Sequence, residues 1–316
     1  MIPYIHVPSW TLGPVTLHPF GLLVAIAVLV GTTLAALRAR KLGLDAEKLR
    51  SFVTWMLVGG FVGGHVIDAL LYRPAQMVSQ PWRLLEIWKS QGSFGGFLGA
   101  LIAVLLWRRY QAFDWFSTPL GSLPGFRRRS RPEPLLPFAD LVLSVFPVAW
   151  IFGRAGCAVA HDHPGIRADP GSLLAVAAGP YDAGGATHLP LGIELRYGTD
   201  PHWDLGTLEL AFTVVLAAAF ATTWRRKLPT GWYVAAVSLA YAPARFAMDF
   251  LRVRETSTAD ARYGSLTPAQ WACMVLFGCG LYLALSRRCD QLGGDGARTC
   301  IGSFSSRERE RMLRSE

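Results

Sequence analysis

Apolar stretches long enough to cross a bilayer recur along the chain, and they limit its possible folds more than any other feature. About 20 apolar residues let an α-helix span the hydrocarbon core of a membrane. The chain has 316 residues, of which 52% are apolar and 17% charged, and a soluble core is not segmented in this way. We therefore predict an all-α, polytopic membrane protein with seven transmembrane helices. The predicted spans are residues 17–37, 52–71, 93–107, 135–152, 205–224, 232–251 and 266–286.

The basic residues predict the orientation of these helices. Four regions hold 21 of the 31 Lys and Arg side chains, whereas nine lie in the alternate loops and Arg245 lies inside a span. Loops rich in Lys and Arg face the cytoplasm, so the N-terminus is predicted outside and the C-terminus inside the cell. The net charge of +9 is thus assigned to loops beside anionic lipid, and no nucleic-acid partner is expected. The four basic regions are residues 38–51, 108–134, 225–227 and 287–316.

The predicted organisation is one seven-span membrane domain over residues 1–289, followed by a disordered cytoplasmic tail at 290–316. The outer-side loop covers residues 162–204 and the basic cytoplasmic loop covers residues 108–134. The first ten residues have no basic segment before a short apolar core, which predicts that no signal peptide is cleaved. The five cysteines form no CxxC pair, so neither a disulfide framework nor a zinc site is indicated.

Ionisable residues gather at the outer ends of the predicted spans. Arg154 ends the fourth span, Glu209 lies one turn into the fifth, and Arg245 and Asp249 lie in the outer half of the sixth. Such groups cost several kcal/mol in a bilayer unless they are paired or face a cavity, which predicts a polar cavity open to the outer leaflet. The alternatives are an Arg154 that reaches the headgroups and a purely structural pair of Arg245 with its i+4 neighbour Asp249. Gln270, which opens the last span, is expected to reach the headgroups.

The stretch from residue 146 to 165 carries the densest chemistry. Arg154 lies between Gly153 and Gly156, and glycines let a ligand approach the backbone while arginine offers a planar fork of donors that suits phosphate. His161 and His163 follow on either side of an aspartate. We interpret this trio as a solvated loop rather than a metal site, and expect no metal.

Seven motifs occur in the order seen in the bacterial prolipoprotein diacylglyceryl transferase family, and the chain resembles a divergent member of it. The resemblance covers most of the chain and implies a seven-span enzyme of the bacterial inner membrane. It implies transfer of the diacylglyceryl group of phosphatidylglycerol to the lipobox cysteine thiol of prolipoproteins, whose signal peptides are then partners beside membrane lipids. The motifs are GPVTLHPFGL, GGHVIDALLY, GSFGGFLGA, FADLVLSVFPVAWIFGRAGC, DLGTLE, YAPARFAMDFLR and LTPAQ.

The resemblance also implies roles for individual residues. The family's signature arginine falls on Arg154 and its second key arginine on Arg245, and both are expected to be catalytic and to hold the lipid phosphate. The remaining residues expected to bind phosphatidylglycerol are Gly153, Gly156, Ser93, Glu209, Asp249 and Asp140.

The chain departs from the family's pattern at several motif positions. Gly95 stands where the family has a histidine often treated as catalytic, and Cys157 replaces the asparagine of GRxGN. Phe20 and His65 replace a tyrosine and an arginine. We hypothesise that His161 or His163 supplies the missing base, because an unperturbed histidine titrates near pH 6.5.

The residues suit the implied chemistry. A thiol must become a thiolate to attack carbon, and two arginines can stabilise a phosphate leaving group, so no cofactor is needed. One rival hypothesis is a non-catalytic relative that binds phospholipid or prolipoprotein, which the missing histidine favours. The other is a small-solute transporter, which predicts polar residues through the full depth of the bilayer.

Overall fold

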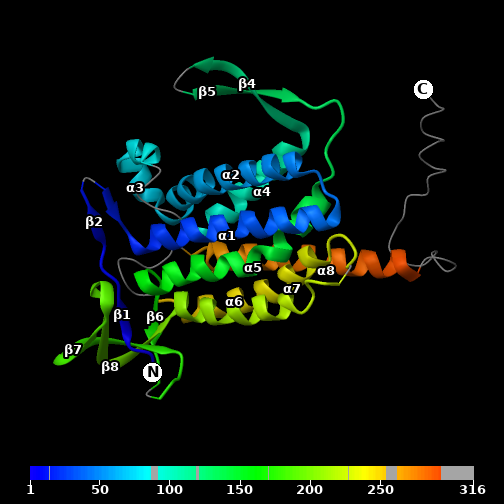
Figure 1. The fold of residues 1–316 in the computed structure, drawn as a ribbon. Helices are drawn as coiled ribbons and strands as arrows, with labels where there is room; N and C mark the ends of the chain where they lie inside the picture. The colour runs from blue at the N-terminus through cyan, green and yellow to red at the C-terminus, as the bar shows by residue number, and fades with distance from the viewer. Residues whose placement is uncertain are drawn as a thin grey trace, which may run out of the picture.

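The architecture is a bundle of helices with small β-sheets at its ends. A computed structural model describes residues 1–13, 15–86, 92–118, 121–169, 171–226, 228–253 and 262–292. The long helices run side by side across Figure 1, with the N-terminal strands beside one end of the bundle. In the described part the long helices are α1 (Pro19–Leu42), α2 (Ala46–Tyr72), α4 (Ser93–Arg109), α5 (Leu135–Ala160), α6 (Leu205–Ala221), α7 (Trp232–Met248) and α8 (Pro268–Leu292).

The structure confirms a mainly helical, multi-pass membrane protein. Within the described residues, five helices are long and apolar enough to cross a membrane, namely α1, α2, α5, α8 and α7 together with the 3₁₀ turn η3 (Asp249–Leu251). The apolar helix α6 and the helix α4 have 17 residues each, which is fewer than a straight span of the bilayer commonly uses. All seven helices coincide with the predicted spans, and α5 continues beyond its predicted end to Ala160.

Local sequence explains where several helices begin and end. Pro19 occupies the first turn of α1, where its missing N–H costs nothing, and Gly43 ends that helix in the left-handed conformation. The Asp45 side chain accepts hydrogen bonds from the first turn of α2. Asp204 does the same for α6, accepting from the Thr207 N–H at 2.8 Å.

Helices α2 and α4 pack with their backbones almost in contact. A Cβ atom built on Gly63 would lie 2.5 Å from the Gly99 Cα, and one on Gly59 would lie 2.2 Å from the Ala103 Cβ. Only glycine permits this approach, so these positions fix how the two helices cross.

A four-stranded sheet lies at the end of the bundle where α1 begins, below and to the left of the helices in Figure 1. It joins β1 (Tyr4–His6), β6 (Pro164–Arg167), β7 (Ala175–His188) and β8 (Glu194–Asp204), and β8 pairs antiparallel with the other three. The all-α prediction is therefore wrong for residues 162–204, where the sequence suggested only a loop. Strand β7 is rich in Ala and Gly and has only two of the β-branched residues that mark a strand, Val176 and Thr187.

The basic loop predicted at residues 108–134 contains an antiparallel hairpin of β4 (Tyr110–Thr118) and β5 (Gly121–Arg128). It follows directly from α4 and extends above α2 in Figure 1. At this end of the bundle Phe52, Trp107 and Phe138 form an aromatic core, with the Trp107 ring centroid 5.0 Å from Phe52 and 5.3 Å from Phe138. The remaining described elements are a smaller hairpin, one short helix and two 3₁₀ turns. They are the hairpin of β2 (Trp10–Leu12) and β3 (Val15–Leu17), the helix α3 (Pro74–Ser79), and the turns η1 (Pro81–Leu85) and η2 (Pro190–Gly192).

Candidate active site

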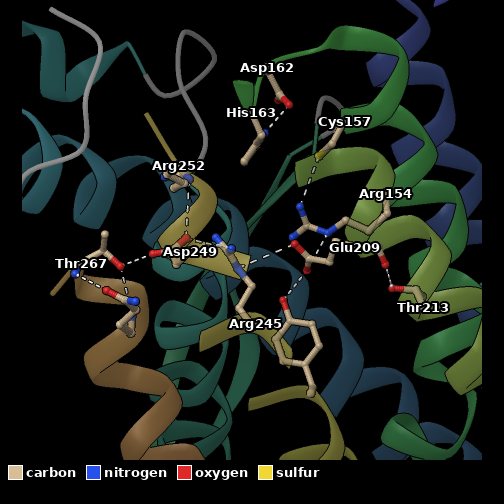
Figure 2. A network of polar contacts seen from close by, with 12 residues as sticks. Arg154, Cys157, Asp162, His163, Glu209, Thr213, Arg245, Asp249, Arg252 and Thr267 are labelled. Atoms are coloured by element: carbon tan, nitrogen blue, oxygen red, sulfur yellow. Dashed lines mark hydrogen bonds and ion pairs between the residues drawn. The ribbon is translucent and has the colours of Figure 1, made fainter. Parts of the chain in front are cut away.

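Four buried charged side chains from three helical segments form one continuous network. Glu209 of α6 lies between two arginines: its Oε1 is 3.0 Å from Arg154 Nε of α5, and its Oε2 is 3.7 Å from Arg245 Nε of α7. Arg245 Nη1 is in turn 2.9 Å from Oδ1 of Asp249. None of the four residues is more than 7% exposed. Figure 2 shows the two guanidinium groups facing each other across Glu209, so the structure brings together four of the residues singled out in the sequence.

The Arg154 guanidinium keeps donors available for a ligand. Its Nε–H is not aligned with Glu209, so that contact is an ion pair rather than a hydrogen bond, and Nη2 has no hydrogen-bond partner among the described residues. The guanidinium carbon lies 4.6 Å from the centre of the Trp150 ring. Stacking on an aromatic face holds the planar group in place without using its donors. A buried arginine with an unused donor is suited to binding an anion.

Tyr241 orients the central carboxylate. Its hydroxyl donates a hydrogen bond to Glu209 Oε1, and it lies one helical turn before Arg245 on α7. The Glu209 backbone carbonyl accepts a hydrogen bond from Thr213 at 2.7 Å. The sequence analysis did not single out Tyr241, although residues at i and i+4 share a helix face.

A capping box holds the far end of the network. Thr267 donates through Oγ1 to Asp249 Oδ2 and accepts from the Gln270 backbone N–H, and the Gln270 side chain accepts from the Thr267 N–H. These reciprocal bonds satisfy the free N–H groups at the start of α8. Gln270 is fully buried, so the expectation that it reaches the headgroups is wrong. Thr267 followed three residues later by Gln270 is the sequence signature of a capping box, which the sequence analysis did not use.

Within the described residues, the network contains one more guanidinium group than carboxylate groups. Arg252 Nε lies 3.6 Å from Asp249 Oδ1 and adds a third guanidinium to Arg154 and Arg245, against the two carboxylates of Glu209 and Asp249. Guanidinium groups of this kind can bind an anion such as a phosphodiester, which carries a single negative charge.

Cys157 and the pair Asp162–His163 lie beside Arg154. Arg154 Nη1 is 3.6 Å from Cys157 Sγ, and ligand atoms of Cys157, Asp162 and His163 lie within 4.8 Å of one another. His163 donates from Nδ1 to Asp162, which leaves Nε2 as the acceptor nitrogen of a neutral ring. The nearby guanidinium opposes a cation at this point, and the expectation of no metal stays a prediction. Figure 2 places these residues together on one side of Arg154.

His161 is used differently, because both of its ring nitrogens contact protein acceptors. Nδ1 lies 2.8 Å from Asp204 Oδ2 and Nε2 lies 3.1 Å from the Ile5 carbonyl. The ring stacks on Tyr4 with centroids 3.9 Å apart. His161 also ends α5 in the left-handed conformation, with φ of 48°. It therefore joins α5 to the N-terminal strand and to the start of α6.

The other predicted site residues lie apart from this network or pack around it. Asp140 accepts a hydrogen bond from the Val234 N–H at the start of α7, about four turns along α5 from Arg154. Gly153 packs beside Trp150, and a Cβ on Gly156 would lie 3.1 Å from the Phe20 ring. Ser93 is the first residue of α4, and its side chain lies outside the described part of the chain.

Gly95 lies inside the tight contact of α2 with α4. A Cβ at this position would lie 2.5 Å from the Gly63 carbonyl oxygen and 3.1 Å from the Ile67 Cβ. No side chain, and least of all a histidine, fits between these two helices here. His65 on α2 instead contacts the Arg83 carbonyl through Nε2 at 3.1 Å.

Apolar helices long enough to span a membrane, around a buried network of arginines and carboxylates, define a multi-pass membrane protein with a charged site in its interior. The family model described as prolipoprotein diacylglyceryl transferase matches residues 8–286, and the chain belongs to this family.

Curated relatives carry the name phosphatidylglycerol–prolipoprotein diacylglyceryl transferase. One from Nitratidesulfovibrio vulgaris (strain Miyazaki F) is 27% identical over 293 residues, which cover 90% of this chain and 95% of the relative. One from Aromatoleum aromaticum is 25% identical, covering 89% of this chain and 95% of the relative. One from Pseudomonas putida is 25% identical, covering 90% and 95%.

Proposed function

We propose that this protein transfers the diacylglyceryl group of phosphatidylglycerol to the lipobox cysteine thiol of prolipoproteins. The membership of the family and the names of the relatives support this activity. The observation that carries it is the pair of buried arginines on different helices that share Glu209. In this proposal the enzyme is a seven-span protein of the bacterial inner membrane, and the arginine network opens toward the outer leaflet.

The buried guanidinium groups of Arg154 and Arg245 provide the binding site for the lipid phosphate. Phosphatidylglycerol carries one negative charge on its phosphodiester, and Arg154 and Arg245 offer fork-shaped donors to it. Glu209 and Asp249 hold the two guanidinium groups in position rather than touching the lipid. Gly153 and Gly156 let the Trp150 and Phe20 rings pack closely against α5 beside Arg154.

The reaction forms one bond and breaks one. The thiolate of the acceptor cysteine attacks the glyceryl carbon that carries the phosphate, a carbon–sulfur bond forms, and the carbon–oxygen bond to phosphate breaks. The leaving group is glycerol phosphate, which takes the bonding electron pair and gains charge beside the arginines. Preorganised donors at developing charge are commonly the largest contribution to catalysis. No cofactor is required by this chemistry.

His163 is the residue we propose as the base that accepts the thiol proton. Its Nδ1 contacts Asp162, so that in the neutral ring with its proton on Nδ1 the nitrogen that takes the thiol proton is Nε2, and it lies next to Cys157 and Arg154. His161 is the weaker candidate, because both of its nitrogens already contact protein acceptors. The acceptor would arrive through its signal peptide from the membrane.

The test is transfer from phosphatidylglycerol to a lipobox peptide by the purified protein, together with complementation of cells depleted of their own transferase. Arg154→Ala and Arg245→Lys should each lower transfer on the order of 10²-fold or more, as for loss of one preorganised donor. Arg245→Lys keeps the charge and loses only the fork.

Arg38→Lys is the matched control. Arg38 is also buried, at 6% exposure, but its guanidinium stacks on Trp224 and Tyr233 at the other end of the bundle. Wild-type rates in both site variants would refute the arginine assignment. Absence of transfer by the unmodified protein would favour the non-catalytic, lipid-binding relative, which the lack of space for a histidine at Gly95 supports.

A further inference from the structure

A second group of arginines surrounds a pocket at the end of the bundle opposite the Arg154 network. The pocket has a volume of about 260 Å³. It lies where α4 ends, β5 ends and the chain turns toward α5, and no step of the proposed transfer uses it. Its lining residues are Arg109, Arg128, Arg129, Ser130 and Pro132.

Arg129 uses its side-chain donors in contacts within the protein. Its Nε donates to the Trp107 and Tyr110 carbonyls, both at 3.2 Å, and its Nη1 lies 3.6 Å from Glu133. Its backbone N–H also donates to the Arg109 carbonyl at 2.8 Å. These bonds satisfy the Trp107 and Arg109 carbonyls at the C-terminus of α4, which weakens the repulsion between that helix end and an anion in the pocket.

Arg109 and Arg128 keep their side-chain donors available. Both are exposed, and within the described residues neither has a salt bridge or a side-chain hydrogen bond. The nearby carboxylate of Glu133 is already shared by Lys48, at 2.9 Å, and Arg129. The guanidinium groups of Arg109 and Arg128 and the Ser130 hydroxyl can therefore donate hydrogen bonds to the oxygens of a phosphate group.

The surroundings of the pocket are those of a membrane interface. Tyr110 pairs with Arg128 across the hairpin, and Phe126 lies two residues before Arg128, so the three side chains share one face of the ribbon. Phe126 is 63% exposed, and its ring lies 5.3 Å from Trp55 of α2. Leu106, one turn before the pocket on α4, is 45% exposed. Exposed aromatic and aliphatic side chains beside arginines are typical of residues at headgroup depth.

We propose that this pocket binds the phosphate of an anionic phospholipid in the leaflet opposite the one that serves the transfer reaction. Arg109 and Arg128 hold the phosphate oxygens, and the face of Tyr110 and Phe126 contacts the adjoining acyl chains. Basic pockets beside transmembrane helices bind anionic headgroups in this way. The site is independent of the transfer chemistry, and its lipid is a ligand rather than a substrate.

The experiment measures lipid retained by the full-length protein in phosphatidylcholine nanodiscs that contain phosphatidylserine, an anionic lipid other than the proposed substrate. Native mass spectrometry counts the phosphatidylserine molecules that remain bound after release. Arg109→Gln combined with Arg128→Gln should weaken retention about tenfold or more, because the phosphate loses its charge-assisted hydrogen bonds to two guanidinium groups. Both residues are exposed, so the fold should be kept, and an unchanged thermal unfolding midpoint checks this.

The matched control is Arg127→Gln combined with Arg131→Gln. It removes the same charge from the same segment, and both residues lie outside the pocket lining. Equal loss in the two double variants would mean that total charge alone attracts the lipid, and would overturn the proposal. A parallel titration with inorganic phosphate distinguishes the source of the anion. Binding of inorganic phosphate without retention of phosphatidylserine would overturn the assignment to a lipid.

Discussion

Glu209 is the residue on which the charged network depends, because it is the shared counter-ion of two buried arginines. A buried guanidinium is costly unless it is paired, and Glu209 pairs with one arginine on each side. The sequence placed Glu209, Arg154 and Arg245 at one depth but could not show that a single carboxylate lies between the two arginines. That geometry depends on how three helices are rotated about their axes.

Replacing Glu209 should therefore destabilise the protein strongly. Glu209→Gln keeps the shape and the hydrogen bond from Tyr241 but leaves the buried Arg154 without its carboxylate partner, while Arg245 keeps Asp249. Breaking a buried pair costs about 3–5 kcal/mol. The midpoint of thermal unfolding in detergent should fall by several degrees. Asp200→Asn is the control, since its pair with the 74% exposed Arg167 side chain should contribute about 0–1 kcal/mol. Equal effects of the two variants would contradict this account.

The two histidines beyond the signature arginine should differ in their effect on the reaction. His163→Gln should lower the rate of transfer by roughly 10²-fold or more, as expected for loss of a general base. His161→Gln should change the rate far less and lower the unfolding midpoint, because it loses contacts to Asp204 and Ile5. His65→Gln, which alters a contact near Arg83, serves as a third comparison. Full rates in all three variants would leave the arginines to activate the thiol alone.

At the scale of elements, the contact of α2 with α4 explains why this chain has no histidine at Gly95. Gly95→His should not restore the family's motif but should push the helices apart, because a Cβ there meets the Gly63 carbonyl at 2.5 Å. We expect a loss of folded protein in size-exclusion chromatography. Gly21→His is the control, because a Cβ on Gly21 meets nothing within 4 Å. A well-folded and more active Gly95→His variant would refute this explanation.

The helices were more predictable than the strands, for a physical reason. Apolar runs of bilayer length give a strong signal, and all seven predicted spans coincide with helices. Strand β7, with its Ala and Gly residues, lacks any such signal and forms only because β8 provides a partner. Within the site, Arg154, Glu209, Arg245 and Asp249 were all expected. Asp140 was expected beside them, but it lies at the far end of α5, since the motif gave its place in the sequence without its depth.

At the scale of the whole molecule, the arginine network and the arginine pocket lie at opposite ends of the bundle. The charge distribution predicts that the network end faces outward. Leu173, which is 83% exposed near β7, and Ser130 in the pocket are suitable positions to test this. The test needs a background in which serine replaces Cys157, Cys273, Cys279, Cys289 and Cys300.

In this background Leu173→Cys should react with a membrane-impermeant maleimide in intact spheroplasts, and Ser130→Cys should react only after lysis. Labelling of Ser130→Cys in intact spheroplasts would reverse the predicted orientation. Labelling of both positions before lysis would place both ends of the bundle on one side, which a set of full spans does not allow.

The order of the helices along the chain has a consequence for biosynthesis. Arg154 is on α5 and its counter-ion Glu209 is on α6, so the ribosome makes the buried cation before the carboxylate that neutralises it. The third partner, Arg245, is made later still, and the Thr267 that holds Asp249 comes last. A nascent chain that has only reached α5 thus carries an unpaired guanidinium, which costs several kcal/mol in lipid. We therefore expect α5 to insert stably only together with the helices that follow it in the sequence.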